Sequence, residues 1–339
     1  MFAHAGPCLC YNARTMDKIA LKELYAPIVG ELEGVRTLVD RLWRDAFSLV
    51  GVRQDNIPSL GGKMLRPALT LLSAGAVGVQ DLASQEKLAA AFETLHVASL
   101  AHDDVIDHAA LRRGHNSLNA LWDNHAAVLG GDFLVANAVE MVADYGVCAV
   151  VTMAVRSVRR MAECELHFFG RLPGDVTRED CVLLARGKTA SLFAVACAAP
   201  ACVAGSPHEK ALYDFGESLG VAFQIIDDIL DLTESDASLG KPSCGDVVEG
   251  KATLPLLYLR EALDESGQKR LDGLRGGELK DSDRAWVREN LDRTGAVARA
   301  LEDANLFQNG AISALNTLPE SVYKQSILGL AEFVLQRNH

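Results

Sequence analysis

Apolar residues recur three and four positions apart along almost the whole chain from residue 17 to residue 339. This spacing places them on one face of an α-helix, whereas a half-buried strand would alternate apolar and polar residues. Because the chain has no clear alternating run of β-branched residues, the pattern predicts an all-α protein. Glycine, proline and asparagine separate helical segments of roughly 10 to 30 residues. These breaks are expected at 56–62, 78–81, 114–116, 130–131, 173–175, 205–207, 240–250, 275–277 and 308–310.

The helical pattern predicts one domain. The chain has 339 residues, 49% of them hydrophobic, which is enough for a large core, and it has no internal repeat of solenoid period. We expect residues 16–339 to form this single domain. Residues 1–15 lack helical periodicity, so they are expected to be a disordered arm, and either Met1 or Met16 can serve as the start of translation. Residues 263–286 are polar and are expected to carry a surface loop.

Charge and cysteine content exclude several classes of protein. The net charge of −12 argues against nucleic acid as a partner, because binding to a phosphate backbone needs a basic face. The eight cysteines contain no CxxC pair, which favours reduced thiols in a cytoplasmic protein over a zinc site or a disulfide scaffold. The longest apolar stretch, residues 191–205, is shorter than the roughly 20 residues of a membrane span and contains Pro200. We therefore expect no transmembrane segment.

Two short acidic motifs, "DDVID" at 103–107 and "DDILD" at 227–231, are the most unusual feature of the sequence. On a helix, Asp103 and Asp107 share one face, and the second motif repeats this spacing. Like charges at this spacing destabilise a helix, and burying them without a partner would cost far more. Divalent cations would offset that cost, and Mg²⁺ prefers oxygen ligands of this kind.

A single acidic motif is usually a solvated turn, because charge runs are usually surface features. Here, however, each motif ends a segment too apolar for a surface helix, "LHVASLA" before the first and "GVAFQII" before the second. Cationic residues follow each motif: Arg112 and Arg113 in one case, Lys241 and Lys251 in the other. Carboxylates, a metal and cations together are how proteins hold a diphosphate.

Two further basic stretches lie elsewhere in the chain. Lys63 and Arg66 follow two glycines at a spacing of one helical turn, and Pro67 suits the first turn of a helix. Lys188 and Thr189 stand in "ARGKTASLF". Neither stretch has the first glycine of a P-loop or a preceding strand, so a nucleotide-binding loop is excluded. Each pair alone would be an ordinary surface feature, but together with two acidic motifs they indicate one site.

Six stretches in their order resemble the all-trans prenyl diphosphate synthase family, and most of all its long-chain, octaprenyl-type members. They cover nearly all of residues 17–339 and are "GGKMLRP" (61–67), "HDDVIDHAALRRG" (102–114), "GGDFLVANA" (130–138), "GKTASLF" (187–193), "FQIIDDILD" (223–231) and "LGKPSCGDVVEGKATLP" (239–255). The resemblance implies a bundle of long helices around a deep central cavity, with the two aspartate motifs facing each other at its mouth. It also implies a homodimer, three Mg²⁺ ions and a transient membrane contact when the product leaves.

The resemblance also implies a role for each matching residue. Mg²⁺, and through it the allylic diphosphate, would be bound by Asp103, Asp104, Asp107, Asp227, Asp228 and Asp231. The allylic diphosphate would be contacted directly by Arg112, Lys188 and Lys241. The diphosphate of isopentenyl diphosphate would be held by Lys63, Arg66, His96 and Arg113. Thr189 and Gln224 would face the reacting carbons. Met64 is a small departure, because many relatives have arginine there, and we expect little effect from it.

Product length depends on what closes the cavity below the first aspartate motif. One helical turn upstream of Asp103, about 5.4 Å along the axis, the chain has Ala98 and Ser99, where short-chain relatives carry bulky residues. Small residues there also allow close helix packing, which is the structural alternative. A deeper floor is expected from Phe92, Val139, Met141 or Tyr145. We therefore favour a product of roughly 35 to 50 carbon atoms, suited to quinone side chains, over a farnesyl-type or geranylgeranyl-type product.

Two other functions stay open at this point. A terpene cyclase shares the first aspartate motif but usually has a second motif of the Asn/Ser/Glu type, whereas this chain has "DDILD". A non-catalytic subunit of a heteromeric prenyl synthase tends to lose aspartates or basic residues, and none of the implied positions is lost here.

Overall fold

A computed structural model describes residues 21–49, 57, 60, 62–107, 111–112, 115–116, 123–169, 171, 173–235 and 242–336. The predicted all-α architecture is confirmed for this part of the chain. Its only strands are β1 (Leu111–Arg112) and β2 (His115–Asn116), which pair antiparallel with Leu111 opposite Asn116. The expected N-terminal arm, residues 1–15, lies outside the described residues.

The helices differ widely in length. The long ones are α2 (Val29–Leu49), α3 (Leu65–Ala76), α4 (Glu86–Ile106), α6 (Asn124–Ala143), α7 (Cys148–Phe168), α9 (Ser191–Val203), α10 (Glu209–Thr233), α15 (Asp281–Thr294), α16 (Ala296–Ala314) and α17 (Val322–Gln336). The short ones are α8 (Arg178–Ala185), α12 (Gly245–Glu249), α13 (Leu254–Ala262) and α14 (Glu265–Asp272). Short 3₁₀ turns are η1 (Ala26–Ile28), η3 (Leu82–Gln85), η4 (Pro173–Asp175) and η6 (Leu315–Thr317), and η5 (Arg186–Ala190) is a π-helical turn.

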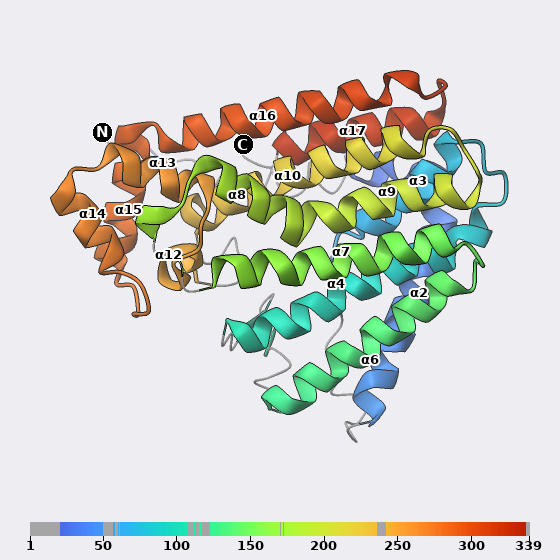
Figure 1. The fold of residues 1–339 in the computed structure, drawn as a ribbon, viewed down its shortest axis with the longest axis horizontal. Helices are drawn as coiled ribbons and strands as arrows, with labels where there is room; N and C mark the ends of the chain where they lie inside the picture. The colour runs from blue at the N-terminus through green and yellow to red at the C-terminus, as the bar shows by residue number, and fades with distance from the viewer. Residues whose placement is uncertain are drawn as a thin grey trace, which may run out of the picture.

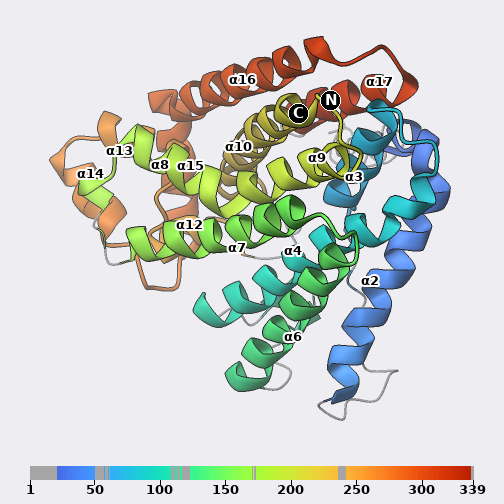
Figure 2. The ribbon, with the colours of Figure 1, turned by 45° about the vertical axis from the view of Figure 1, so that its right-hand side comes forward.

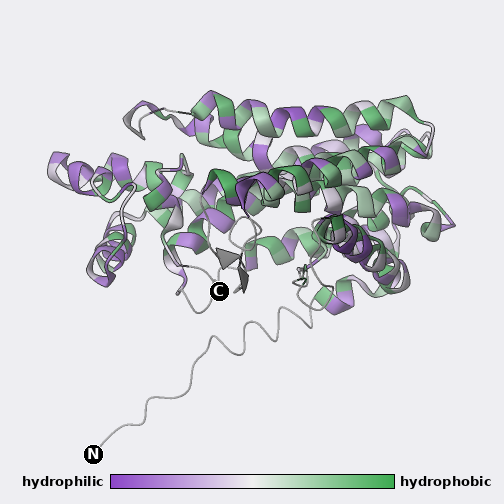
Figure 3. Cartoon of the chain, turned by 90° about the horizontal axis from the view of Figure 1, so that it is seen from below, coloured by the Kyte–Doolittle hydropathy of each residue, from purple (hydrophilic) through white to green (hydrophobic). Residues whose placement is uncertain are grey.

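The long helices form a bundle in which α9 and α10 are central. Helix α10 packs against α9 on one side and α16 on another, and α9 also packs on α3 and α7 (Figure 1). Helices α4 and α6 lie side by side below them in both ribbon views (Figures 1 and 2). Helices α13, α14 and α15 gather at one end of the bundle. Hydrophilic residues dominate the end that holds α14 and α15 (Figure 3).

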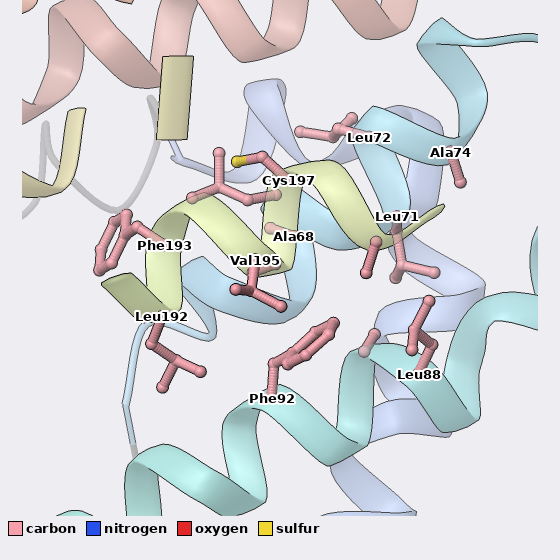
Figure 4. Close-up of a cluster of buried hydrophobic side chains, with 14 of the residues drawn as sticks. Ala68, Leu71, Leu72, Ala74, Leu88, Phe92, Leu192, Phe193, Val195 and Cys197 are labelled. Carbon is pink, nitrogen blue, oxygen red and sulfur yellow. The ribbon is translucent and has the colours of Figure 1, made fainter. Parts of the chain in front are cut away.

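The core consists of two main groups of buried side chains. The larger one joins α2, α3, α4, α9 and α17 with the first part of α10, and Phe92, Phe193 and Phe215 are among its fully buried residues. Figure 4 shows Phe92 rising from α4 beneath Val195 of α9, with Leu88 one turn earlier on α4. The second group joins α8, the later part of α10, α13, α15 and α16. The aspartate motif on α10 lies beside this second group.

Some sequence expectations about local structure were wrong or incomplete. The glycines at 130–131 and 308–310 do not break the chain but lie inside α6 and α16. The polar stretch 263–286 carries the expected loop at 273–280, but it also contains α14 and the start of α15. Helix α14 forms because the Asp264 carboxylate caps it, accepting a hydrogen bond of 2.8 Å from the Gly267 N–H. Lys63 precedes α3 instead of lying on it, although Pro67 is in the first turn as expected.

Two described helical stretches, Asn124–Ala143 and Arg178–Val203, are long and apolar enough to cross a membrane by length and composition alone. In the second, 78% of the apolar window is buried inside the bundle, as in the core helix of a folded domain. In the first, which is α6, only 33% of the window is buried. Helix α6 therefore presents an apolar face that the other described residues leave largely uncovered, with Val128 and Leu129 among its exposed side chains.

Candidate active site

The first aspartate motif lies at the end of α4, where two of its carboxylates meet lysines from distant segments. Asp103 Oδ2 is 3.6 Å from Lys188 Nζ, and Asp107 Oδ2 is 3.6 Å from Lys251 Nζ. Asp107 caps the helix, and its N–H donates to the Asp103 carbonyl at 2.8 Å. Asp104 is buried. The common face of Asp103 and Asp107 stays a prediction, and their lysine partners, Lys188 and Lys251, both approach this end of α4.

Lys188 owes its position to the π-helical turn η5. Such turns are rare and often occur at functional sites, because one extra residue re-aims the side chains. Here Gly187 allows η5 to press against α7: a Cβ at this residue would lie 2.7 Å from Cys164 Sγ. Lys188 Nζ then lies 2.6 Å from Glu165 Oε1 on α7. Burial alone would lower the lysine pKa, but Asp103 and Glu165 outweigh it, so the net pKa is raised and the ammonium stays charged.

Lys251 joins the two aspartate motifs. Besides Asp107 it contacts Asp246 at 3.8 Å and forms an ion pair with Glu249. Burial opposes its charge, but these carboxylates raise its pKa above the ordinary value. The Asp246 N–H in turn donates to Asp231 Oδ2 of the second motif at 3.0 Å. The two motifs therefore border a common space, with a lysine between them.

The second motif lies on the last turns of α10, and Asp228 is part of a hydrogen-bond chain. Thr189 Oγ1 donates to Gln224 Oε1, and Gln224 Nε2 donates to Asp228 Oδ1 at 2.7 Å. The structure thus brings together Thr189 and Gln224, the two residues expected to face the reacting carbons. Burial and the neighbouring carboxylate of Asp246 raise the pKa of Asp228 well above its usual range.

Asp231, the last aspartate of the second motif, has a different environment. It is 3% exposed, and its Oδ2 and backbone carbonyl both accept hydrogen bonds from the segment around α12. That segment starts at Cys244, whose φ of 60° is in the left-handed region that non-glycine residues rarely adopt. The contacts show Asp231 fixing this turn, and its role as a metal ligand stays a prediction.

Two of the cations expected to hold isopentenyl diphosphate, Lys63 and Arg66, are placed over aromatic rings. Lys63 Nζ is 5.1 Å from the centroid of the Phe333 ring on α17, and the Arg66 guanidinium carbon is 4.8 Å from that of Phe193 on α9. Lys63 itself stands in a strained turn, because the next residue, Met64, has a φ of 53°. The Tyr25 hydroxyl stabilises this turn by donating to the Lys63 carbonyl at 2.8 Å.

The remaining predicted residues are described to different extents. His96 lies on α4 about two turns before Asp103, and its carbonyl accepts a hydrogen bond of 2.8 Å from Ser99 Oγ. Arg112 is described as part of β1 only in its backbone. Arg113 and Lys241 lie outside the described residues.

The residues expected to control product length lie on α4 and on or just beyond α6. Ala98 is fully buried and Ser99 half-buried, while Phe92 is fully buried in the core against α9 (Figure 4). Val139 is half-buried on α6. Tyr145 lies beyond the end of α6, where its hydroxyl donates to the Ser84 carbonyl at 2.6 Å and accepts from the Leu88 N–H at 3.0 Å.

Sequence reasoning gave no role to three acidic residues that line this space: Glu165, Asp246 and Glu249. Asp246 and Glu249 lie in the quoted stretch 239–255, so their position near Lys251 was a usable signal. Glu165 gave no such signal, because it is separated by 23 residues in sequence from Lys188, which it contacts.

The residues present fit magnesium. In the part of the chain that the structure describes, no three His, Cys, Asp or Glu side chains are arranged so that they alone could hold a metal ion. Mg²⁺ is usually bound by one or two carboxylates together with waters and substrate phosphates, so a site completed by a diphosphate needs no such group. The donors are all carboxylate oxygens. Burial together with the neighbouring Asp246 carboxylate raises the pKa of Asp228, so a bound cation would stabilise its charged form.

Comparison with known proteins agrees with this geometry. The family model described as "Polyprenyl synthetase" matches residues 52–289, more than half of the chain. The chain is 34% identical to an all-trans-nonaprenyl-diphosphate synthase (geranyl-diphosphate specific) of Rhodobacter capsulatus, over 93% of this chain and 98% of that one. It is 36% identical to an octaprenyl diphosphate synthase of Haemophilus influenzae, over 96% of this chain and all of that one.

A solved structure of a polyprenyl synthase from Caulobacter crescentus, complexed with calcium and isoprenyl diphosphate, superposes with a TM-score of 0.84. The two chains are 32% identical, and the match covers 94% of this chain and 98% of that one. The fold, the paired aspartate motifs and these matches lead to one conclusion: the chain belongs to the polyprenyl synthetase family and is a trans-prenyltransferase.

Proposed function

We propose that this enzyme condenses isopentenyl diphosphate head-to-tail with an allylic diphosphate to make a long all-trans polyprenyl diphosphate. The observation that carries the proposal is the placement of Lys188 and Lys251 between carboxylates of distant segments. Two charged lysines and two aspartate motifs around one space are suited to a leaving diphosphate, which needs cations on several sides.

The reaction makes one carbon–carbon bond. The carbon–oxygen bond between the allylic carbon and its diphosphate breaks, and the electron pair leaves with the diphosphate. The double bond of isopentenyl diphosphate attacks the resulting cation, and a proton is lost, which the departed diphosphate can accept. Mg²⁺, three ions by family resemblance, supplies positive charge that stabilises the leaving group when bound.

The chain's own residues have distinct tasks in this proposal. Lys188 binds the allylic diphosphate and is kept charged by Asp103 and Glu165. Lys63 and Arg66, which stack over aromatic rings of α17 and α9, hold the diphosphate of isopentenyl diphosphate. Thr189 and Gln224 present a fixed chain of dipoles to the reacting carbons. The site must keep water from the cation, which water would otherwise quench.

For product length we infer a chain of roughly 35 to 50 carbon atoms, suited to a quinone side chain, because Ala98 and Ser99, one turn before Asp103, are small. The names of the nonaprenyl and octaprenyl relatives support this range. A farnesyl-type or geranylgeranyl-type product is the alternative.

We further propose that the enzyme is a cytoplasmic homodimer in which α6 meets its counterpart. Only 33% of the apolar window of α6 is buried in one chain. Asp132 and Glu140 lie within the helix, and a charge at the centre of a bilayer is costly, so a second copy fits this face better than a lipid span. Contact with a membrane would then be transient and limited to product release.

One incubation tests the proposed function: purified protein with Mg²⁺, farnesyl diphosphate and labelled isopentenyl diphosphate. We expect a labelled, acid-labile polyprenyl diphosphate whose dephosphorylated alcohol runs in the long-chain range on reversed-phase thin-layer chromatography. A labelled short alcohol would replace the inferred length by the short-chain alternative. A cyclic hydrocarbon would indicate a terpene cyclase, and no incorporation at all would indicate a non-catalytic subunit.

A further inference from the structure

The stretch "GGDFLVANA" on α6 has no task in the reaction proposed above, yet it packs against the end of α4 that carries the first aspartate motif. The contact is made by His102, the residue directly before Asp103. His102 Nε2 lies 3.2 Å from the Val128 carbonyl oxygen and 3.5 Å from Asp132 Oδ1. Both partners are on α6.

These two partners determine the tautomer and the orientation of the His102 imidazole ring. A carbonyl oxygen can only accept a hydrogen bond, so Nε2 of His102 must carry a hydrogen and donate it to Val128. The carboxylate of Asp132 beside the same nitrogen favours that tautomer. The ring is therefore held in one orientation by α6.

Gly131 explains how the ring comes so close. A Cβ at this residue would lie 2.2 Å from His102 Nε2 and 2.5 Å from its Cδ2, far inside van der Waals contact. The ring therefore rests on the bare backbone of α6. A glycine inside a helix is unfavourable in itself, so its presence here is accounted for by this contact. Gly130, its neighbour, faces open space.

We propose that His102 is a positioning residue for the first aspartate motif. Clamped between Gly131, the Val128 carbonyl and Asp132, its ring fixes the last turn of α4 against α6. That turn carries Asp103, whose carboxylate lies 3.6 Å from Lys188. His102 itself touches no substrate and acts through its neighbours. The inference rests on the proposed diphosphate site.

The test compares His102→Phe, which keeps a ring but loses the donor, with His102→Gln, whose amide nitrogen can reach the same carbonyl. Steady-state kinetics would give KM separately for the allylic diphosphate and for isopentenyl diphosphate. Calorimetry with Mg²⁺ and farnesyl thiodiphosphate, a slowly reacting analogue, would give the affinity without turnover. Thermal unfolding would report stability.

For His102→Phe we expect affinity for the thiodiphosphate and KM for the allylic substrate to worsen about tenfold or more, as with other residues that orient a site's ligands. KM for isopentenyl diphosphate should change less than about twofold, because Lys63 and Arg66 lie just before and in the first turn of α3 and His96 is more than one turn before His102 on α4. His102→Gln should recover most of the loss. Equal effects on both substrates, or a lowered Tm with unchanged affinity, would overturn the proposal.

Glycine variants provide the matched control. In the otherwise unaltered enzyme, Gly131→Ala should weaken thiodiphosphate binding as His102→Phe does. In a His102→Ala background it should weaken binding little further, because the added methyl group clashes only with the His102 ring. Gly130→Ala should be neutral in both backgrounds. An equal effect of Gly131→Ala with and without the ring would contradict the clamp. An unaltered enzyme that fails to bind the thiodiphosphate would instead overturn the proposed function.

Discussion

Lys188 forms a closer ion pair with Glu165 of α7, at 2.6 Å, than with Asp103 of the first aspartate motif, at 3.6 Å. The lysine side chain is thus oriented by the Glu165 carboxylate, which belongs to neither aspartate motif. Because it is fixed and charged before substrate arrives, little reorganisation is needed when the diphosphate leaves.

We therefore predict that Lys188→Ala lowers kcat/KM for the allylic diphosphate by roughly a hundredfold to a thousandfold, the range for loss of one preorganised electrostatic group. Lys188→Arg should retain part of the activity. Lys210→Ala is the matched control, because that lysine is 84% exposed and pairs only along its own helix with Asp214. Steady-state kinetics measure all three, and equal losses for Lys188→Ala and Lys210→Ala would contradict the assignment.

The helix before Lys188 supplies a prediction about pH. Asp180 forms a capping box at the start of α8 with Thr177, and Arg171 lies 3.2 Å away. The Thr177 backbone N–H hydrogen bond, opposed in part by burial, lowers the pKa of Asp180 below its usual value. A depressed carboxyl pKa contributes stability that is complete above the unfolded-state pKa and is lost as pH falls through the folded-state pKa.

Asp180→Asn should therefore lower the free energy of unfolding by roughly 0.5 to 1 kcal/mol at pH 7, since it removes a charge-assisted cap. The difference between the two proteins should shrink as the pH falls below about 4, where the aspartate itself becomes protonated. Denaturant unfolding followed by circular dichroism at several pH values measures this. Asp175→Asn, in the exposed turn η4, is the control, and a difference that stays constant with pH would refute the explanation.

Asp103→Ala and Asp227→Ala test the metal assignment. Each should reduce turnover by orders of magnitude, because one carboxylate of a motif can no longer neutralise or orient the Mg²⁺–diphosphate group. Tm without Mg²⁺ should be nearly unchanged, since the lost contacts are offset by relief of like-charge repulsion along each helix. Asp214→Ala, an exposed aspartate on the same helix as Asp227, should keep normal activity. Near-normal turnover in either motif variant would overturn the assignment.

The all-α fold could be predicted from the sequence, because helical periodicity is a local signal, whereas the roles assigned to the motif residues stay predictions. The partners across the site could not. Nothing in the spacing places Glu165 against Lys188, since a π-helical turn and a close pass at Gly187 bring them together. Asp231 shows the same limit: its spacing from Asp227 could not reveal that its carboxylate accepts a hydrogen bond from the Asp246 amide, and its role as a metal ligand stays a prediction.

Glycine was the least predictable residue. The pair at 130–131 is typical of a turn, yet it lies within α6. Glycine is needed there because Gly131 faces the imidazole ring of His102 on α4. A single sequence does not distinguish a glycine needed for a positive φ from one needed for close approach. The helices within the polar stretch 263–286 could not be recognised from the sequence either. Helix α14 buries little and has few apolar residues to show a helical period.

Ala98 gives the sharpest prediction about product length. It is fully buried on α4, between Asp103 near the site and Phe92 deeper in the core. A larger side chain here would project into the space that the growing chain needs, so Ala98→Phe should shorten the product. Inserting a ring into a packed core also costs about 1–3 kcal/mol, so Ala98→Val should be made as a milder step with a smaller shift.

Reversed-phase thin-layer chromatography of the dephosphorylated products measures the shift, with the total incorporation of label as a check on activity. Ala149→Phe, at an exposed position on α7, should leave the product ladder unchanged. If Ala98→Phe stays folded and active but makes the same product as the unaltered enzyme, the growing chain does not pass this residue. Product length would then have to be set on another helix, with the half-buried Val139 of α6 as the next residue to enlarge.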